Sequence, residues 1–179
     1  MGRPRKIIGE KCYLTPISKS DVDTYTRWIN DLKTTIPLGM AHHPASRGTF
    51  LKQAEDLIQS RKQVYNIVTR GTEVFIGRIM LDEIDYIHRR AEMRLILGEK
   101  DYTGEDYDVE AIIMLLDYSF NILNLNSVVA IVPSINRKGI RAYKEAGFTI
   151  IGRTRESTII AGEMYDDIWL DILSEEFRS

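Results

Sequence analysis

The hydrophobic pattern along the chain predicts a succession of strands and helices. Helices are predicted where apolar residues recur every three or four positions: from Ser18 or Ser20 to about 31, and over 46–61, 107–123 and 136–146. Strands are predicted where apolar residues alternate or cluster: 11–17, 64–70, 74–84, 91–98, 127–132, 148–155 and 163–173. This order favours an α/β (mixed α+β) fold, in which about four helices cover both faces of a central mixed sheet of about six to seven strands.

Helix 107–123 and the strand after it are expected at the centre of the core. The helix carries a wide apolar stripe, and the following strand, SVVAIV (127–132), is β-branched and apolar until Pro133 ends it. Residues 31–45 contain two prolines and a glycine and are predicted to form an irregular loop.

The length of 179 residues fits a single domain, because no repeat, low-complexity tract or Gly/Ser linker marks a boundary. We therefore expect one domain over 1–179, with 1–9 as a flexible tail. The basic residues Arg3, Arg5 and Lys6 of this tail are expected to be solvated rather than to form a binding arm.

The net charge of −2 gives no basic field, which argues against a nucleic-acid partner. The one cysteine, Cys12, excludes an intrachain disulfide and suits a reducing compartment, so a cytoplasmic location is expected. No apolar run approaches the ~18 residues of a membrane span. The N-terminus also lacks the apolar segment of a signal peptide, so no membrane partner is expected.

The segment DYTGEDYDVEA (101–111) combines features of an anion site with three acidic residues. A glycine just before a helix can present backbone N–H groups to a phosphate. The carboxylates of Glu105, Asp106 and Asp108 repel such a ligand, by about 4 kcal/mol for one pair at ~4 Å and an effective dielectric of ~20. Two alternatives follow: Asp106 or Asp108 caps the helix and fills its N–H groups, or the carboxylates face solvent.

Four segments in order resemble the GCN5-related N-acetyltransferases: HRRAE (88–92), LNLNSVVAIV (123–132), NRKGIRAYKEAGF (136–148) and GEMYDD (162–167). The branch that they resemble contains ribosomal-protein N-terminal and spermidine N-acetyltransferases. The resemblance covers roughly residues 10–173 and is most specific over 136–148. It implies acetyl transfer from acetyl-CoA, as cosubstrate, to a primary amine of a small molecule, a polyamine or a protein N-terminus.

The resemblance also implies where acetyl-CoA binds. The backbone of Leu95, Ile96 and Leu97 would hold the pantetheine arm, and Asn136 would hydrogen-bond to it. The diphosphate would bind to the loop that matches the family's phosphate signature, which here consists of Thr103, Gly104, Glu105, Asp106, Tyr107 and Asp108. This loop departs from the family pattern by its acidic residues. Nearby basic residues could compensate for that charge: Lys100, Arg137, Lys138 and Arg141.

Three residues are candidates for the chemistry. Tyr143 matches the position proposed in the family as the acid for the leaving thiolate; the alternative is a core residue. Glu92 and Glu83 are candidates for the base or for amine recognition, since Glu83 matches an acidic substrate-contacting position in spermidine acetyltransferase. Their alternatives are an ion pair of Glu92 with Arg89, Arg90 or Arg94, and a solvated strand end for Glu83. Alternation places Glu92 on the same strand face as Arg94 and Ile96.

Two other functions stay open on the sequence because the phosphate loop is acidic. One is a catalytically degenerate binding module, and the other is a transferase that uses an acyl donor other than CoA. No metal site is expected, because the adjacent His42 and His43 have no set of further ligands near them in the sequence. A homodimer is considered by analogy with the same branch.

Overall fold

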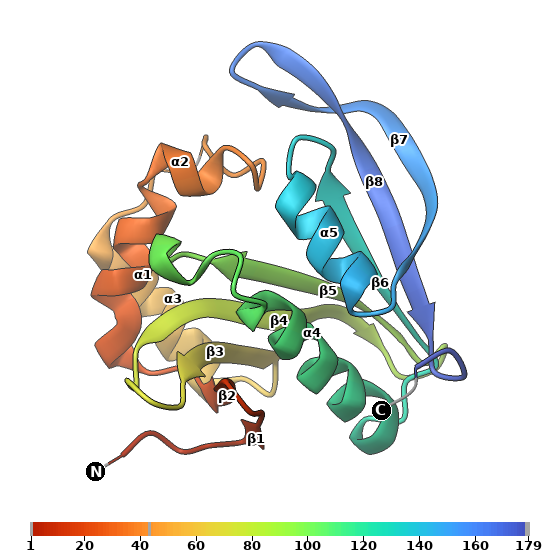
Figure 1. The fold of residues 1–179 in the computed structure, drawn as a ribbon. Coiled ribbons are helices and arrows are strands. Elements are labelled where there is room, and N and C mark those ends of the chain that lie inside the picture. Colours follow the sequence, from red (N-terminus) through yellow and green to blue (C-terminus); the bar gives the residue numbers. More distant parts are fainter. Residues whose placement is uncertain (1, 43, 178–179) are drawn as a thin grey trace.

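The structure, a computed structural model, describes residues 2–42 and 44–177 and is built on one eight-stranded sheet (Figure 1). The strand order is β1-β2-β3-β4-β5-β6-β8-β7, and β5 and β6 are parallel while the other neighbours are antiparallel. The strands are β1 (Ile7–Ile8), β2 (Cys12–Pro16), β3 (Gln63–Thr69), β4 (Phe75–Asp85), β5 (Arg90–Leu97), β6 (Ser127–Pro133), β7 (Thr149–Ile160) and β8 (Glu163–Leu173).

Helices cover both faces of the sheet (Figure 1). They are α1 (Val22–Ile29), α2 (Leu32–Thr35), α3 (Arg47–Gln59), α4 (Tyr107–Asp117) and α5 (Arg137–Glu145). Helices α4 and α5 pack on one face and form a large core with the inward residues of β2 to β6 and β8. Helix α1 packs on the opposite face, where Tyr25, Trp28 and Ile29 contact Ile96 of β5 in a second, smaller core.

Local signals in the sequence explain where several helices begin and end. Ser46 caps α3 by accepting the Thr49 N–H at 3.1 Å, and Asn136 caps α5 by accepting the Gly139 N–H at 3.0 Å. Gly147 follows α5 with a φ of 107°, the left-handed conformation expected of a C′ residue. Helix α4 continues into a π turn at Tyr118–Ile122, which together match the predicted helix 107–123.

The predicted element order is confirmed, with three differences. Eight strands form the sheet instead of six to seven, because Ile7–Ile8 add a short edge strand. The predicted loop 31–45 contains the short helix α2, for which Asp31 is the N-cap and accepts the Lys33 N–H at 3.0 Å. Strand β7 runs on to Ile160 because, after an irregularity between Thr154 and Thr158, it pairs again with β8 over Thr158–Ile160.

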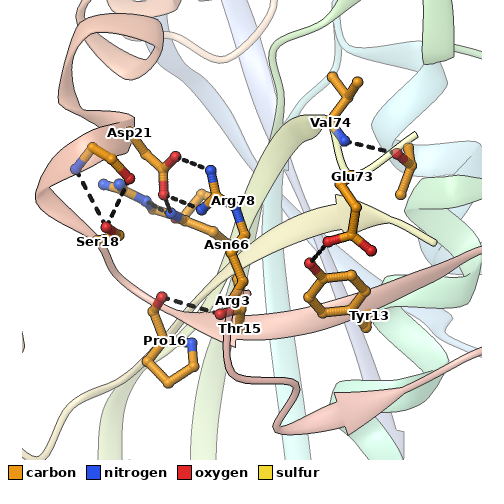
Figure 2. A network of polar contacts seen from close by, with 12 residues as sticks. Arg3, Tyr13, Thr15, Pro16, Ser18, Asp21, Asn66, Glu73, Val74 and Arg78 are labelled. Carbon is orange, nitrogen blue, oxygen red and sulfur yellow. Dashed lines mark hydrogen bonds and ion pairs between the residues drawn. The ribbon is translucent and has the colours of Figure 1, made fainter. Parts of the chain in front are cut away.

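The N-terminal segment expected to be a flexible tail is held by polar contacts instead. Arg3 forms two hydrogen bonds with the carboxylate of Asp21, which is buried and also accepts a hydrogen bond from Asn66 at 2.8 Å (Figure 2). Arg78 in turn donates to Asn66 at 3.1 Å. A buried carboxylate needs charged or polar partners, and this requirement fixes the Arg3 side chain.

Helix α4 is tied to the turn between β1 and β2 by Glu110. Its carboxylate accepts the backbone N–H groups of Glu10 at 2.6 Å and Cys12 at 2.9 Å, and a bifurcated bond from the Lys11 N–H. The buried thiol of Cys12 also donates to it at 3.1 Å. Burial works to raise the Glu110 pKa, but these hydrogen bonds outweigh burial and hold the pKa below its usual value.

Candidate active site

The two parallel strands in the middle of the sheet separate. Strands β5 and β6 pair only at Arg90–Ser127, Ala91–Val128 and Glu92–Val129, and no further pair joins Met93–Leu97 to β6. The β6 side of the second half of β5 is therefore not used by the sheet. Its backbone groups are available to another partner, since backbone N–H and C=O groups need a hydrogen bond wherever they are buried.

Leu95, Ile96 and Leu97 lie in this separated part of β5. Ile96 points towards α1 in the second core, whereas Leu95 and Leu97 pack against the core under α4 and α5. Their side chains are thus used for packing on both faces. Only their main chain faces the gap, as expected for residues that bind a ligand through backbone atoms.

Tyr143 of α5 lies beside the same strand. Its side chain is buried, and its hydroxyl donates to the carbonyl oxygen of Met93 at 3.2 Å. Burial raises the pKa of Tyr143 above the usual value of a phenol, so the hydroxyl keeps its proton. The residue packs against Phe148, and its O–H group, bound to the Met93 carbonyl, lies at the point where β5 leaves β6.

The loop from Thr103 to Asp108 follows β5 and leads into α4. Gly104 has a φ of 91° and Asp106 a φ of 60°, while the residues between and after them have negative φ. Alternation of this kind directs successive amide N–H groups to one side and forms an anion-binding concavity. Among the described residues, the amide N–H groups of Gly104 to Asp108 have no hydrogen-bond acceptor.

The three carboxylates of the loop leave these amides free. Asp106 occupies the N-cap position of α4, but its side chain makes no capping hydrogen bond. Asp108 accepts only the N–H of Val109, at 3.0 Å. Glu105 is exposed, and its carbonyl oxygen accepts from Lys11 Nζ at 2.9 Å. The helix is therefore not closed to an anion by its own acidic residues.

One basic residue of α5, Arg141, lies close enough to the loop for the charges of Asp106 and Asp108 to act on it. A hollow of about 480 Å³ is lined by Arg137, Ile140, Arg141, Lys144 and Glu145. The pKa of Arg141 is raised, mainly by its ion pair with Glu145 at 2.7 Å and further by the charges of Asp106 and Asp108. Arg141 thus lies within the field of the acidic loop. Lys138, on the same helix, adds a further positive charge to α5.

Lys100 is placed differently from the sequence expectation. Its ammonium group forms an ion pair with Asp31 of α2 at 2.6 Å. Asn136 is the N-cap of α5, and an added Cβ on Gly139 would lie 2.6 Å from its side-chain nitrogen. The side-chain oxygen of Asn136 is engaged with the Gly139 N–H, so its Nδ2 group is the part that could bind a ligand.

Glu92 lies on the sheet face opposite α4 and α5. Its carboxylate forms an ion pair with Arg94 at 2.7 Å, and Arg94 is also 3.6 Å from Asp82. Of the three arginines considered as ion-pair partners of Glu92, the structure shows Arg94. The hydrogen bond to Glu92, followed by the charges of Glu92, Asp82 and Glu83, raises the pKa of Arg94.

Glu83 occupies an irregular position at the end of β4. Its φ is 48°, and the register with β5 shifts between Asp82 and Asp85. The structure thus brings Glu83 near Arg94, but Glu83 lies in a bulge, whereas Glu92 is in a regular pair with Asp82. The pattern of the sequence alone gave no sign of this bulge.

The sequence reasoning missed one carboxylate of this face, Asp171 of β8. Val129 pairs with Glu92 on one side and with Asp171 on the other, so the two acidic residues point to the same face. Their Cα atoms are two strands apart, roughly 10 Å. The alternation in DIWLDIL (167–173) was the available signal, and burial raises the pKa of Asp171.

Within residues 2–42 and 44–177, no three His, Cys, Asp or Glu side chains gather as a metal site. His43 lies outside the described residues. In the same described part of the chain, no helix has the length and apolar character needed to cross a membrane.

Comparison with known proteins identifies relatives of this chain. A spermidine N(1)-acetyltransferase of Vibrio cholerae serotype O1 is 34% identical over 111 residues, which cover 62% of this chain and 64% of that protein. The spermidine N(1)-acetyltransferase of Escherichia coli K12 is 32% identical over 101 residues, which cover 56% of this chain and 54% of that protein. The chain thus spans between about half and two thirds of the length of these curated relatives.

The crystal structure of spermidine N-acetyltransferase from Vibrio cholerae in complex with CoA and spermine superposes with a TM-score of 0.84 and 25% identity. The match covers 94% of this chain and 98% of that one. A sequence model described as an acetyltransferase (GNAT) domain matches residues 11–149. That match covers most of the chain and confirms the resemblance found in the sequence, so the protein belongs to the GNAT acetyltransferase family.

Proposed function

We propose that the protein transfers an acetyl group from acetyl-CoA to a primary amine. The observation that carries this proposal is the free row of amides from Gly104 to Asp108, which lies at the end of the strand that separates from β6. A diphosphate bound to these amides would be near the basic side of α5, including Arg141 and Lys138. The residues present therefore fit the CoA part of acetyl-CoA.

In the reaction, the amine nitrogen attacks the thioester carbonyl carbon, the C–N bond forms, the C–S bond breaks, and the amine loses a proton while the sulfur gains one. Tyr143 is proposed to stabilise the leaving sulfur by its O–H group. Because burial raises its pKa, a complete proton transfer to a thiolate of pKa ~8.5 is unfavourable, and the hydrogen bond is the main contribution. The hydroxyl must exchange the Met93 carbonyl oxygen for the sulfur.

The amine acceptor is proposed to bind on the sheet face opposite α4 and α5, where Glu92 lies. Its carboxylate could attract an ammonium group or relay a proton through water, although Arg94 occupies its Oε1 atom. Glu83 is proposed as an additional acidic contact near the end of β4. The relative crystallised with CoA and spermine favours a polyamine as acceptor; a protein N-terminus remains the other class to test.

We also propose a cytoplasmic location and a homodimer of a single-domain chain. The buried free thiol of Cys12 suits a reducing compartment. Exposed apolar residues on the last hairpin support self-association: Ile150, Ile151, Ile159, Met164 and Trp169. Light scattering of the purified chain tests the dimer.

The test of the proposed function uses calorimetry with CoA and an assay that detects the released thiol with a panel of amines. CoA at a concentration of 100 times its dissociation constant should add ~2.7 kcal/mol to the free energy of unfolding. The acidic loop is the observation that favours the rival function, a degenerate binding module. No CoA binding would support that rival and remove the CoA-dependent transferase, whereas CoA binding with thiol release for an amine would support the transferase.

A further inference from the structure

Glu99, the second residue after the separated strand β5, is bound by α1. Trp28 Nε1 donates to Glu99 Oε1 at 3.0 Å, and Arg27 forms an ion pair with the same oxygen. Trp28 is buried against Gly98, where an added Cβ would lie 1.9 Å from its Cδ2 atom. The last turn of α1 is thus fixed to Gly98 and Glu99, which lie between β5 and the diphosphate loop.

The next residue, Lys100, is bound by α2. Its ammonium group contacts Asp31 Oδ2 at 2.6 Å. The other oxygen of Asp31 caps α2 by accepting the Lys33 N–H, and Thr34 donates to Oδ2 at 3.2 Å. The pKa of Asp31 is lowered, first by the hydrogen bond from Lys100. Lys100 therefore interacts with the side chain that sets where α2 begins.

The chain after α2 crosses to the far side of the separated strands. We name residues Ile36–Met40 the strap. An added Cβ on Gly39 would lie 3.4 Å from Thr158 Cγ2 and 3.6 Å from Pro133 Cγ, so the strap lies close to the end of β6 and to strand β7. Leu38 and Met40 pack against the second core beside α1. The strap thus connects the end of β5 with the end of β6.

We propose that Glu99 and Lys100 are positioning residues that couple the diphosphate loop to the strap. This inference rests on the proposed function. The free amides begin at Gly104, only a few residues after Lys100, and Thr103 N–H donates to the Lys100 carbonyl at 3.1 Å. A ligand that fixes the amides therefore also fixes Glu99 and Lys100, which hold α1, α2 and the strap.

Leu38 and Met40 of the strap pack on the sheet face of Ile96 and Glu92, where the acceptor is proposed to bind. Coupling of this kind is reciprocal: donor binding tightens acceptor binding by the same factor as acceptor binding tightens donor binding. Lys100 and Asp31 form a partly exposed ion pair, which is worth about two- to fivefold in an equilibrium constant. Glu99 adds the hydrogen bond from the buried Trp28 ring. The loss of either contact should raise the KM of the amine by about this factor while kcat changes little.

The experiment compares the full-length wild type with Lys100→Met and Glu99→Gln, with and without CoA. Hydrogen–deuterium exchange is followed in peptides that cover Arg27–Met40. The matched control is Lys19→Ala, which removes a different surface ion pair of a lysine, that with Glu55. Calorimetry with CoA and the KM of spermidine as the amine are measured on the same four proteins.

We expect CoA to slow hydrogen–deuterium exchange over Arg27–Met40 in the wild type and in Lys19→Ala. The effect should be smaller in Lys100→Met and Glu99→Gln. Slowed exchange of equal size in all four proteins, or no change in the wild type with CoA bound, would overturn the coupling alone. A large, salt-dependent loss of CoA affinity in Lys100→Met would also overturn it, because Lys100 would then bind phosphate directly. No CoA binding by the wild type would overturn the proposed function and the coupling together.

Discussion

Replacing Asp106 by Gly tests whether the acidic loop opposes a diphosphate. Asp106 has a φ of 60° and a ψ of 18°, is exposed and makes no capping bond, so its removal breaks no described contact. Placing a glycine at this left-handed position relieves ~1 kcal/mol of backbone strain in the folded protein. The greater freedom of glycine in the unfolded chain costs ~0.5–1 kcal/mol. The stability of Asp106→Gly should therefore differ little from the wild type.

The affinity for CoA should rise instead. A like-charge pair at ~4 Å costs about 4 kcal/mol at an effective dielectric of ~20 but only about 1 kcal/mol in water. Because the Asp106 side chain is exposed, the lower figure applies, and removal of its charge should tighten CoA binding about fivefold. Salt should shrink this gain, since the Debye length falls from ~10 Å at 0.1 M to ~3 Å at 1 M.

Calorimetric titration with CoA at low and high salt measures this effect, and Asp106→Asn is the matched control. Asparagine removes the charge but keeps a side chain that tolerates the left-handed region. Equal gains in both variants identify the charge as the cause, whereas a gain in the glycine variant alone identifies steric obstruction. Unchanged or weaker CoA affinity in both variants would refute the argument that this carboxylate repels the diphosphate.

Three further changes test other parts of the structure. Tyr143→Phe should lower kcat about 100-fold with CoA affinity nearly intact, as for the loss of an acid or hydrogen-bond donor, and an unaltered kcat in the thiol-release assay would remove Tyr143 from the chemistry. Gly98→Ala places a Cβ 1.9 Å from Trp28 Cδ2 and should cost at least ~1–3 kcal/mol in urea unfolding, whereas Gly71→Ala, with no atom within 4 Å, should cost far less. Because the Glu110 pKa is lowered from 4.5 in the folded protein, the stability it contributes is complete above pH 4.5 and is lost as the pH falls through the folded pKa. Glu110→Gln should flatten this acid limb, and an unchanged pH profile of unfolding would contradict the assignment.

The order of elements could be predicted because it rests on periodicity within each segment. Helix α4 and strand β6 have strong apolar patterns and were found almost to the residue. Strand β1 has only two residues, and its position depends on pairing with β2, which periodicity does not contain. The far half of β7 is mostly polar and exposed before Thr158, and its pairing with β8 makes it a strand.

The candidate site was predicted where it depends on chain position and missed where it depends on tertiary contacts. The resemblance placed the loop before α4, but no sequence rule gave Asp106 its left-handed conformation. The partner of Lys100 is Asp31, far away in the sequence, so Lys100, predicted as a charge that could compensate for the acidic loop, pairs instead with the N-cap residue of α2. Gly98 beside Glu99 was a usable signal, since a glycine at a strand end can mark a large side chain packed on the backbone.

The burial of Cys12 beside the Glu110 carboxylate has a chemical consequence for a protein that would release a free thiol at every turnover. Burial and the neighbouring negative charge raise the pKa of Cys12, so its sulfur is rarely a thiolate, the form that attacks disulfides. Oxidised coenzyme accumulating in solution would therefore find no reactive sulfur in this turn with which to form a mixed disulfide. The contact that holds α4 against the first strands thus also keeps Cys12 from forming a mixed disulfide with the oxidised form of the released coenzyme.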